Sequence, residues 1–363
     1  MNIIPQKTKI LHIAPFNIAG VPISFVQAER ELGYYSRLIT FGRLQHGFQE
    51  DICLNLPLLN FKGLKLVKRL FSDKAKLQVI NVAPKLDVIP LQWRPNGYFE
   101  KHLIDLREAL WKSKINNTIK KYNIEQFDII QLDGGLGFYR DGRIIQSLKK
   151  QGKKIISCYT GSDLRVRGVI PQIDAITDLN VTDEFDHLQL HPNIHHVFFP
   201  LNLQKFNPVE FRHHNILKIG HAPTSREAKG SHKIIPLVKQ LEKNYSVKLI
   251  LIENLPYNDA IELKSKCDIF IDQIGDLGYG INSLESLAMS IPTCSCLAPN
   301  FAEKYPDHPF IVIDEHNLQQ QLIHLIEDSK LRQKKGKQGR QWVEKYHDAQ
   351  KVVKRIHRLA GFG

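Results

Sequence analysis

The sequence has no apolar run long enough to cross a membrane and no cysteine pair of the kind that holds a structural metal. A spanning helix needs about 18–20 consecutive apolar residues, and the 363-residue chain contains no such run. Its five cysteines are scattered, without a C-x-x-C pair, which favours reduced thiols over disulfides or zinc. Residues 1–16 lack the long apolar region and cleavage site of a signal peptide. We therefore expect a cytoplasmic protein.

Motifs for metals and dinucleotides are also missing. There is no H-E-x-x-H pattern, and Pro192 interrupts the histidine-rich stretch 187–196, so we expect no metal site. The loop Asn17–Pro22, "NIAGVP", does not follow the strict G-x-G-x-x-G fingerprint of dinucleotide-binding proteins. The sequence contains no internal repeat at solenoid periods.

The net charge of +13 favours polyanionic partners, namely nucleic acid, anionic lipid or phosphorylated substrates, although it also serves solubility. Nucleic-acid binding needs basic residues interleaved with exposed aromatics. Trp342 and Tyr346 in the basic tail fit a packed helix better, so we expect no nucleic-acid partner.

Segment 61–77, "FKGLKLVKRLFSDKAKL", is basic, with apolar residues near helical spacing. One interpretation is an amphipathic helix lying on an anionic membrane, which would place the protein at the inner face of that membrane. The other interpretation, which we favour, is a helix whose apolar face enters the core of the first domain.

Apolar strands and amphipathic helices alternate in two blocks, separated by the Pro- and Asn-containing stretch 199–215. Such alternation predicts parallel sheets with helical crossovers, and the length predicts two domains. We expect an α/β protein of two Rossmann-like open-sheet domains facing across a cleft. The predicted domains are residues 1–203 and 204–340, followed by a C-terminal helix, 341–363, that crosses back to the first domain.

Ligands of open α/β sheets bind beyond the carboxyl ends of the strands, and "LGYGINSLESLAMSIPT", Leu277–Thr293, lies at one such end. Gly278 and Gly280 permit a tight turn. The N-terminus of the helix that follows suits a phosphate or diphosphate. Glu285, one turn inside, would repel phosphate but can accept hydrogen bonds from ribose hydroxyls. The other interpretation is that Glu285 only complements the helix dipole.

Two further loops follow predicted strands. In "GHAPTSREAKG", Arg226 and Lys229 can neutralise a diphosphate, or they are two solvated surface cations. In "YTGSDLRVRG", Asp163 and Arg165 offer polar groups at a strand end, or belong to an ordinary polar loop.

Together these segments resemble a retaining, nucleotide-sugar-dependent glycosyltransferase of the GT-B fold, close to family four (glycosyl transferases group 1). "GYGINSLESLAMSIPT" resembles that family's G-F-G…E-A-M-A-x-G-x-P-V, and "TGSDLR" resembles H-G-S-D-[IV]-R. "HAPTSREAKG" and "DIFIDQIGDLGYG" resemble a branch with H-A-P-T…K-G and D-Q…G-x-Y-G. The resemblance spans nearly the whole chain and is most specific from Ile219 to Thr293.

The resemblance implies roles for matching residues. Glu285 would bind the donor ribose, the Gly280 and Ile281 backbone would meet the diphosphate, and Lys229, with Arg226, would stabilise the leaving diphosphate. Further donor-side candidates are Tyr279, Asn282, His221 and Thr224. The acceptor-side candidates are Asn17, Gly20, Asp163 and Arg165. No metal or other cofactor is implied.

Three residues depart from the family pattern. Leu277 stands where the family has the first glutamate of a Glu-x7-Glu pair, Thr160 stands where it has a histidine, and His221 replaces an arginine. These departures concern the end of the site that would hold the donor sugar, whereas the nucleotide end keeps the family pattern.

The sequence thus predicts an enzyme that moves a sugar from a nucleotide-diphosphate donor to a hydroxyl of a glycan or lipid-linked acceptor, with retention, in cell-surface polysaccharide or glycolipid synthesis. One alternative is a GT-B protein that binds nucleotide-sugars without catalysis. A second is a nucleotide-sugar epimerase, which would need further acid/base carboxylates.

Overall fold

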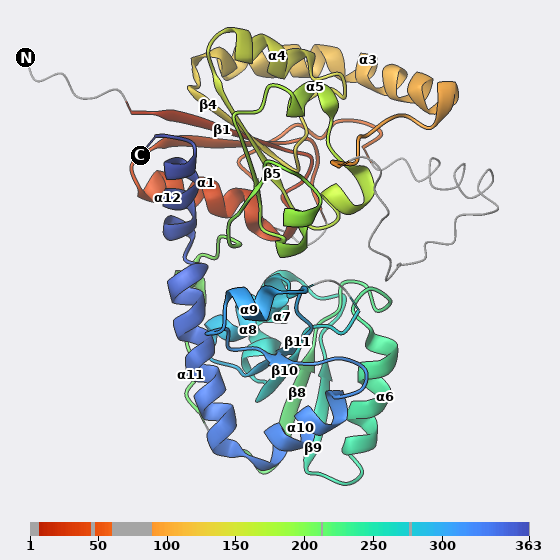
Figure 1. The fold of residues 1–363 in the computed structure, drawn as a ribbon, viewed down its shortest axis with the longest axis vertical. Coiled ribbons are helices and arrows are strands. Elements are labelled where there is room, and N and C mark those ends of the chain that lie inside the picture. The colour runs from red at the N-terminus through yellow and green to blue at the C-terminus, as the bar shows by residue number, and fades with distance from the viewer. Residues whose placement is uncertain (1–6, 45–47, 60–88, 212, 276–277, 363) are drawn as a thin grey trace, which may run out of the picture.

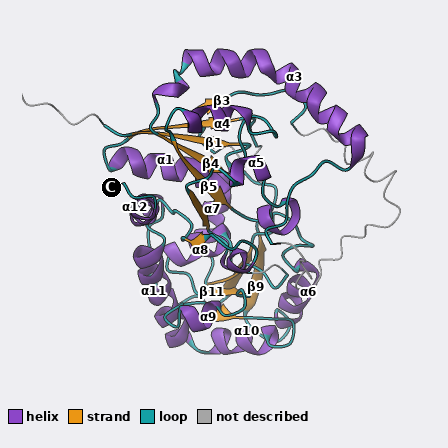
Figure 2. Cartoon of the chain, turned by 45° about the horizontal axis from the view of Figure 1, so that its top comes forward, coloured by secondary structure: helices purple, strands orange, loops and turns teal. Residues whose placement is uncertain are grey.

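The computed structural model describes residues 7–44, 48–59, 89–211, 213–275 and 278–362, which form two parallel β-sheets flanked by helices (Figure 1, Figure 2). The N-terminal sheet has the strand order β3-β2-β1-β4-β5-β6-β7. Its strands are β1 (Lys9–Ala14), β2 (Tyr35–Thr40), β3 (Ile52–Cys53), β4 (Ile129–Asp133), β5 (Lys154–Tyr159), β6 (Leu179–Thr182) and β7 (His195–His196). Its helices are α1 (Val21–Glu31), α3 (Gly97–Lys121), α4 (Arg143–Lys150) and α5 (Pro171–Asp174).

The C-terminal sheet has the strand order β12-β11-β10-β8-β9. Its strands are β8 (Leu217–His221), β9 (Val247–Leu251), β10 (Ile269–Ile271), β11 (Thr293–Ser295) and β12 (Ile311–Val312). The helices that follow β8 in the chain are α6 (Ser231–Leu241), α7 (Tyr257–Ser265), α8 (Ile281–Ala288), α9 (Phe301–Lys304), α10 (Leu318–Glu327), α11 (Ser329–Tyr346) and α12 (Ala349–Leu359).

The predicted pair of Rossmann-like domains is confirmed, because both sheets are parallel and covered by helices. Central strands such as β1 are buried along nearly their whole length, as expected for a sheet with helices on both faces. Counted within each domain, the N-terminal sheet has the common doubly wound order 3-2-1-4-5-6 with β7 added at its edge, and the C-terminal sheet has the other common order, 2-1-3-4-5. The order reverses between β1 and β4 and between β8 and β10, and ligands bind at such switch points.

The chain passes between the domains twice, through residues 197–216 and again near His347. At this crossing the Leu201 N–H donates to the His347 carbonyl at 2.7 Å and the Ala349 N–H donates to the Leu201 carbonyl at 3.2 Å. Helix α11 runs along the C-terminal domain, and α12 lies beside α1 of the N-terminal domain (Figure 1). The last helix therefore fastens the two domains together.

A buried charge network holds α12 to α1. His12 on β1 contacts Glu29 at 2.9 Å and Asp133 at 3.0 Å, and Glu29 also accepts from His357 on α12 at 3.1 Å. Burial alone would lower the pKa of His12, but the two carboxylates raise it to about 10. Burial likewise would raise the pKa of Glu29, yet His12 and His357 lower it to about 2. These shifts favour a charged His12 ring beside an ionised Glu29.

The segment 61–77 and Leu277 lie outside the described residues, so the membrane and core interpretations of that segment both stay predictions. Within the described ranges, no helix combines the length and the apolar character that crossing a membrane requires.

Candidate functional site

The N-terminus of α8 is built at the switch point between β8 and β10. Asp272 directly follows β10, and its Oδ2 accepts from the Gly280 N–H at 3.0 Å and from the Ser283 hydroxyl at 2.7 Å. Asp272 therefore caps α8 from a neighbouring strand. The next N–H groups, of Ile281 and Asn282, belong to the first turn of the helix and have no acceptor within it.

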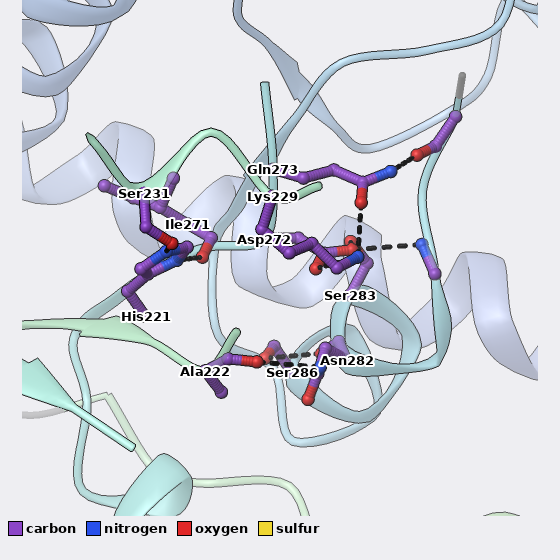
Figure 3. Close-up of polar contacts among 12 residues, drawn as sticks. His221, Ala222, Lys229, Ser231, Ile271, Asp272, Gln273, Asn282, Ser283 and Ser286 are labelled. Atoms are coloured by element: carbon purple, nitrogen blue, oxygen red, sulfur yellow. Dashed lines mark hydrogen bonds and ion pairs between the residues drawn. The ribbon is translucent and has the colours of Figure 1, made fainter. Parts of the chain in front are cut away.

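Lys229, from the loop before α6, lies against this cap (Figure 3). Its Nζ is 3.0 Å from Asp272 Oδ1 and donates also to Gln273 Oε1. The ammonium also lies close to the backbone of Gly280, since a Cβ built on that residue would be 3.4 Å from Lys229 Nζ. Burial alone would raise the pKa of Asp272, but Lys229, Ser283 and the Gly280 N–H lower it. The ammonium is thus held by an ionised partner beside the start of α8.

Glu285 is 3% exposed and faces two partners from α7. Its Oε1 accepts a 2.9 Å hydrogen bond from the Tyr257 hydroxyl, and its Oε2 pairs with Lys264 Nζ. Lys264 also donates to Asn282 Oδ1 at 2.7 Å, and burial beside Glu285 raises the pKa of Tyr257. The carboxylate is an ionic partner inside the domain as well as a candidate ligand for ribose.

His221 and Asn282 both use their side chains in hydrogen bonds within the C-terminal domain (Figure 3). His221 is fully buried, with Nδ1 2.8 Å from the Ile271 carbonyl and Nε2 2.8 Å from the Ser231 hydroxyl. Burial lowers the pKa of His221, which favours the neutral ring. Asn282 Nδ2 donates to the Ala222 carbonyl at 3.0 Å. In this structure both side chains brace the loop after β8 rather than presenting free polar atoms.

The remaining donor-side candidates are dispersed. Arg226 is exposed and makes a bidentate pair with Glu253, at 2.8 and 2.6 Å, instead of joining Lys229. Thr224 is exposed on the same loop. The Tyr279 ring is buried, stacked on Phe310 with centroids 4.7 Å apart.

On the acceptor side, Asn17 and Gly20 shape the loop between β1 and α1. Asn17 is buried, donates to the Gln49 carbonyl at 2.8 Å and accepts from the Ile23 N–H at 3.3 Å. Gly20 has φ +70°, and a Cβ there would come within 2.9 Å of Phe48. The Phe48 ring in turn packs on Tyr257 of the other domain, with centroids 4.8 Å apart. The acceptor-side loop and the α8 site thus meet through two aromatic rings.

Asp163 and Arg165 lie after β5 but have different surroundings. Arg165 forms two bonds to Asp186, at 2.7 and 2.5 Å, and a 2.8 Å bond to Glu184. Asp163 accepts from the Thr160 N–H at 3.1 Å, and burial raises its pKa despite the nearby Arg167. Arg165 therefore anchors this loop to the loop after β6.

Four residues of the site were not among the predicted ones: Asp272, Gln273, Tyr257 and Lys264. Asp272 and Gln273 could have been found, because they directly follow a predicted strand. Tyr257 and Lys264 precede Glu285 by 28 and 21 positions, and no local pattern links them to it. In the described parts of the chain, no cluster of three or more His, Cys, Asp or Glu side chains could hold a metal ion.

Comparison with known proteins gives no match to a family model and none to a curated protein. Solved structures do match. Sucrose-phosphate synthase from Thermosynechococcus elongatus is 13% identical with a TM-score of 0.58, over 97% of this chain and 98% of that one. An α-glucosyltransferase in complex with UDP and a DNA 13-mer is 9% identical with a TM-score of 0.58, over 98% and 100%. WaaG, a glycosyltransferase involved in lipopolysaccharide biosynthesis, is 9% identical with a TM-score of 0.53, over 98% and 100%.

At these identities the likeness concerns the fold. Together with the two parallel sheets and their strand orders, it shows that the chain has the two-domain GT-B architecture.

Proposed function

We propose that this protein is a glycosyltransferase that moves a sugar from a nucleotide-diphosphate donor to an acceptor hydroxyl. The observation that supports this most is the grouping at the β8–β10 switch point, where Lys229 lies against the N-terminus of α8 and Glu285 lies one turn along the same helix. A cation and free N–H groups suit a diphosphate, and a carboxylate suits ribose hydroxyls. The structural relative solved with UDP agrees with a donor of this class.

In the proposed complex the diphosphate accepts hydrogen bonds from the Ile281 and Asn282 N–H groups. An ammonium has three donors, and Asp272 and Gln273 take two of those on Lys229, so the third serves the diphosphate. Arg226 is the second proposed cation, released from Glu253. Each Glu285 oxygen can accept a further hydrogen bond beside those from Tyr257 and Lys264, and we assign these positions to the ribose.

The proposed reaction retains the anomeric configuration. The bond between the anomeric carbon and the diphosphate oxygen breaks, the bond to the acceptor oxygen forms on the same face, and the hydroxyl proton passes to the departing diphosphate. The protein contributes mainly by stabilising charge on the diphosphate, through groups already in place. Because Lys229 and the helix N–H groups supply this stabilisation, the proposal requires no metal.

We further propose that the acceptor is a glycan or lipid-linked glycan of a cell-surface polysaccharide or glycolipid, held by the N-terminal domain on the cytoplasmic side of the membrane. The net charge of +13 suits work near anionic lipid. The core interpretation of the basic segment 61–77 remains the favoured one, and a membrane contact through this segment is the alternative that belongs to this proposal.

A nucleotide-sugar-binding protein without catalysis is the second candidate. It is favoured by the pairing of both proposed cations with carboxylates, Lys229 with Asp272 and Arg226 with Glu253. Release of nucleoside diphosphate separates the two functions. An enzyme releases it from a donor sugar, slowly with water and faster with acceptor, whereas a binding protein releases none.

The decisive experiment is a thermal-shift screen with UDP, GDP, ADP and their sugars. At least one should raise the Tm, and its 2′-deoxy form should raise it less, because ribose hydroxyls are expected on Glu285. The double variant Glu285→Gln/Lys264→Met, which removes the buried ion pair together, should abolish that difference.

The matched control is Glu262→Gln/Lys266→Met, which removes an exposed ion pair at the end of the same helix α7. This variant should keep the difference in thermal shift between ribose and 2′-deoxyribose nucleotides. Equal shifts from ribose and deoxyribose nucleotides in the unmodified protein would refute the role of Glu285. No shift from any nucleotide would refute the proposed function.

A further inference from the structure

A small cavity lies at the other switch point, where β1 and β4 end in the N-terminal domain. Its volume is about 100 Å³. Its apolar walls are Pro15, Phe16, Phe41, Leu59, Trp111 and Leu136–Tyr139. Two arginines, Arg107 on α3 and Arg140 after β4, also line it, together with Glu108. The place is the one where a doubly wound domain binds its ligand, and none of the roles proposed above uses it.

Both arginines have buried nitrogens that lack partners. Among the described residues, Nη1 of Arg140 and Nε of Arg107 are buried without a hydrogen-bond acceptor. Buried polar groups in folded proteins are nearly always paired, so each exception requires an explanation. Each guanidinium group nevertheless packs on an aromatic ring. The Cζ atom of Arg107 lies 4.5 Å from the Trp111 ring centroid, and the Cζ atom of Arg140 lies 5.1 Å from the Trp93 ring centroid.

The charge around the cavity is positive. Glu108 is the carboxylate in the lining, and its Oε1 accepts the backbone N–H of Arg140 at 2.8 Å rather than a guanidinium hydrogen. Its Oε2 is 3.8 Å from Arg143. Burial and repulsion from Arg167 and Arg107 lower the pKa of Arg140 to about 10. One guanidinium nitrogen of each arginine is therefore buried at the cavity without an acceptor, while Glu108 in the same lining bonds to the backbone N–H of Arg140.

We infer that this cavity is an oxyanion subsite that receives a phosphate or carboxylate group carried by the acceptor. This inference rests on the proposed function and narrows its substrate to acidic acceptors. Guanidinium groups bind such oxyanions through directed, charge-assisted hydrogen bonds. A cavity of about 100 Å³ has room for a group of the size of a phosphate or carboxylate.

The subsite is connected to the donor helix through a chain of contacts. Phe16 in its wall is followed directly by the loop Asn17–Gly20, and Gly20 packs on Phe48. Phe48 packs on Tyr257, which bonds to Glu285. An acceptor anchored by its anionic group in the cavity would therefore extend along the loop after β1 toward the α8 site.

Tryptophan fluorescence should report the binding of an anion in this cavity. The chain has three tryptophans, and two of them, Trp93 and Trp111, lie against the two arginines. The full-length protein would be titrated with sodium phosphate, sodium acetate and sodium chloride at constant ionic strength. We expect a saturable change with phosphate or acetate that chloride does not produce. A response to phosphate alone assigns a phosphate group, and a response to acetate alone assigns a carboxylate.

The variants Arg140→Met and Arg107→Met should each weaken oxyanion binding at least tenfold, and the exposed Arg358→Met on α12 should leave it unchanged. Methionine keeps the aliphatic length of the side chain and removes the buried nitrogen that has no acceptor, so both variants should fold, which circular dichroism checks. Arg140→Lys keeps the charge without the planar fork and should also weaken binding. A response equal to that of chloride, or one that survives in Arg140→Met, would overturn the inference.

The test of oxyanion binding does not depend on whether a nucleotide binds at the α8 site. Nucleotide-induced thermal shifts should be the same in Arg140→Met as in the unmodified protein, because α8 lies in the other domain. If no nucleotide binds but the oxyanion response is present, the subsite stands and the proposed function fails. If nucleotides bind but no oxyanion response appears, the proposed function stands and the subsite fails.

Discussion

The Tyr257 hydroxyl donates a 2.9 Å hydrogen bond to Oε1 of Glu285, while the Tyr257 ring packs against Phe48 of the other domain. One side chain therefore touches both the acceptor-side loop and the carboxylate proposed for the donor ribose. Tyr257 therefore connects the contact between the domains to the carboxylate at which we propose that the ribose binds.

Tyr257→Phe should lower the Tm of the ligand-free protein yet enlarge the shift caused by a nucleoside diphosphate. Removing the hydroxyl leaves Oε1 of Glu285 buried with one partner fewer, which costs about 1–3 kcal/mol, while the phenyl ring keeps its packing on Phe48. Ribose can then take the vacated position. Thermal shift with and without nucleotide checks this, and a smaller shift in the variant would contradict it.

Lys229→Met should reduce turnover about a hundredfold or more, the usual loss when one charge-stabilising donor is removed. The single variant also leaves Asp272 buried without its cation, which costs about 3–5 kcal/mol. The double variant Lys229→Met/Asp272→Asn should regain most of that stability but not the turnover.

The comparison of these two variants separates catalysis from folding. Recovery of turnover together with the Tm in the double variant would show that Lys229 acts only through stability. Lys233→Met, which removes an exposed pair with Glu315, is the matched control and should change neither quantity.

Arg226→Met should lower turnover less than Lys229→Met does, roughly tenfold, because Arg226 must first leave Glu253. Its exposed ion pair with Glu253 should contribute little to stability because solvent screens the two charges, so the Tm should hardly change. Steady-state kinetics of nucleoside diphosphate release measure the effect. Unchanged kcat and KM would remove Arg226 from the site.

The His12–Glu29 network should make stability depend on pH. The pKa of His12 is raised from 6.5 to about 10 by folding, so its contribution is complete below pH 6.5 and is lost as the pH rises through about 10. The pKa of Glu29 is lowered to about 2, so its contribution is complete above pH 4.5 and is lost on acidification through about pH 2.

We therefore expect the Tm contribution of this pair to be greatest between about pH 4.5 and 6.5 and to fall towards pH 10. Calorimetry from pH 5 to 10 measures it. The double variant His12→Gln/Glu29→Gln should be less stable throughout but show a flatter decline above pH 7, and an equally steep decline would contradict the assignment.

Much of the fold follows from local sequence. The alternation of apolar strands with helices predicts two parallel open sheets, because each period of the pattern determines an element and crossover geometry then orders them. Gly278 and Gly280 also predicted a tight turn with a helix after it, and the structure begins α8 at Ile281. Turns and hydrophobic periodicity depend on residues that are neighbours in the chain, so they can be recognised from the sequence alone.

The hydrogen-bond and ion-pair partners of the site residues depend on tertiary packing instead of on neighbouring residues. The sequence alone identified Lys229, Arg226 and Glu285 as candidates because charged residue types at strand and helix ends are visible along the chain. Only the tertiary structure decided that Lys229 pairs with Asp272, Arg226 with Glu253 and Glu285 with Lys264. It also placed Arg107 and Arg140 at one cavity. Such contacts join residues tens of positions apart, and their distances depend on how strands and helices pack rather than on any spacing in the sequence.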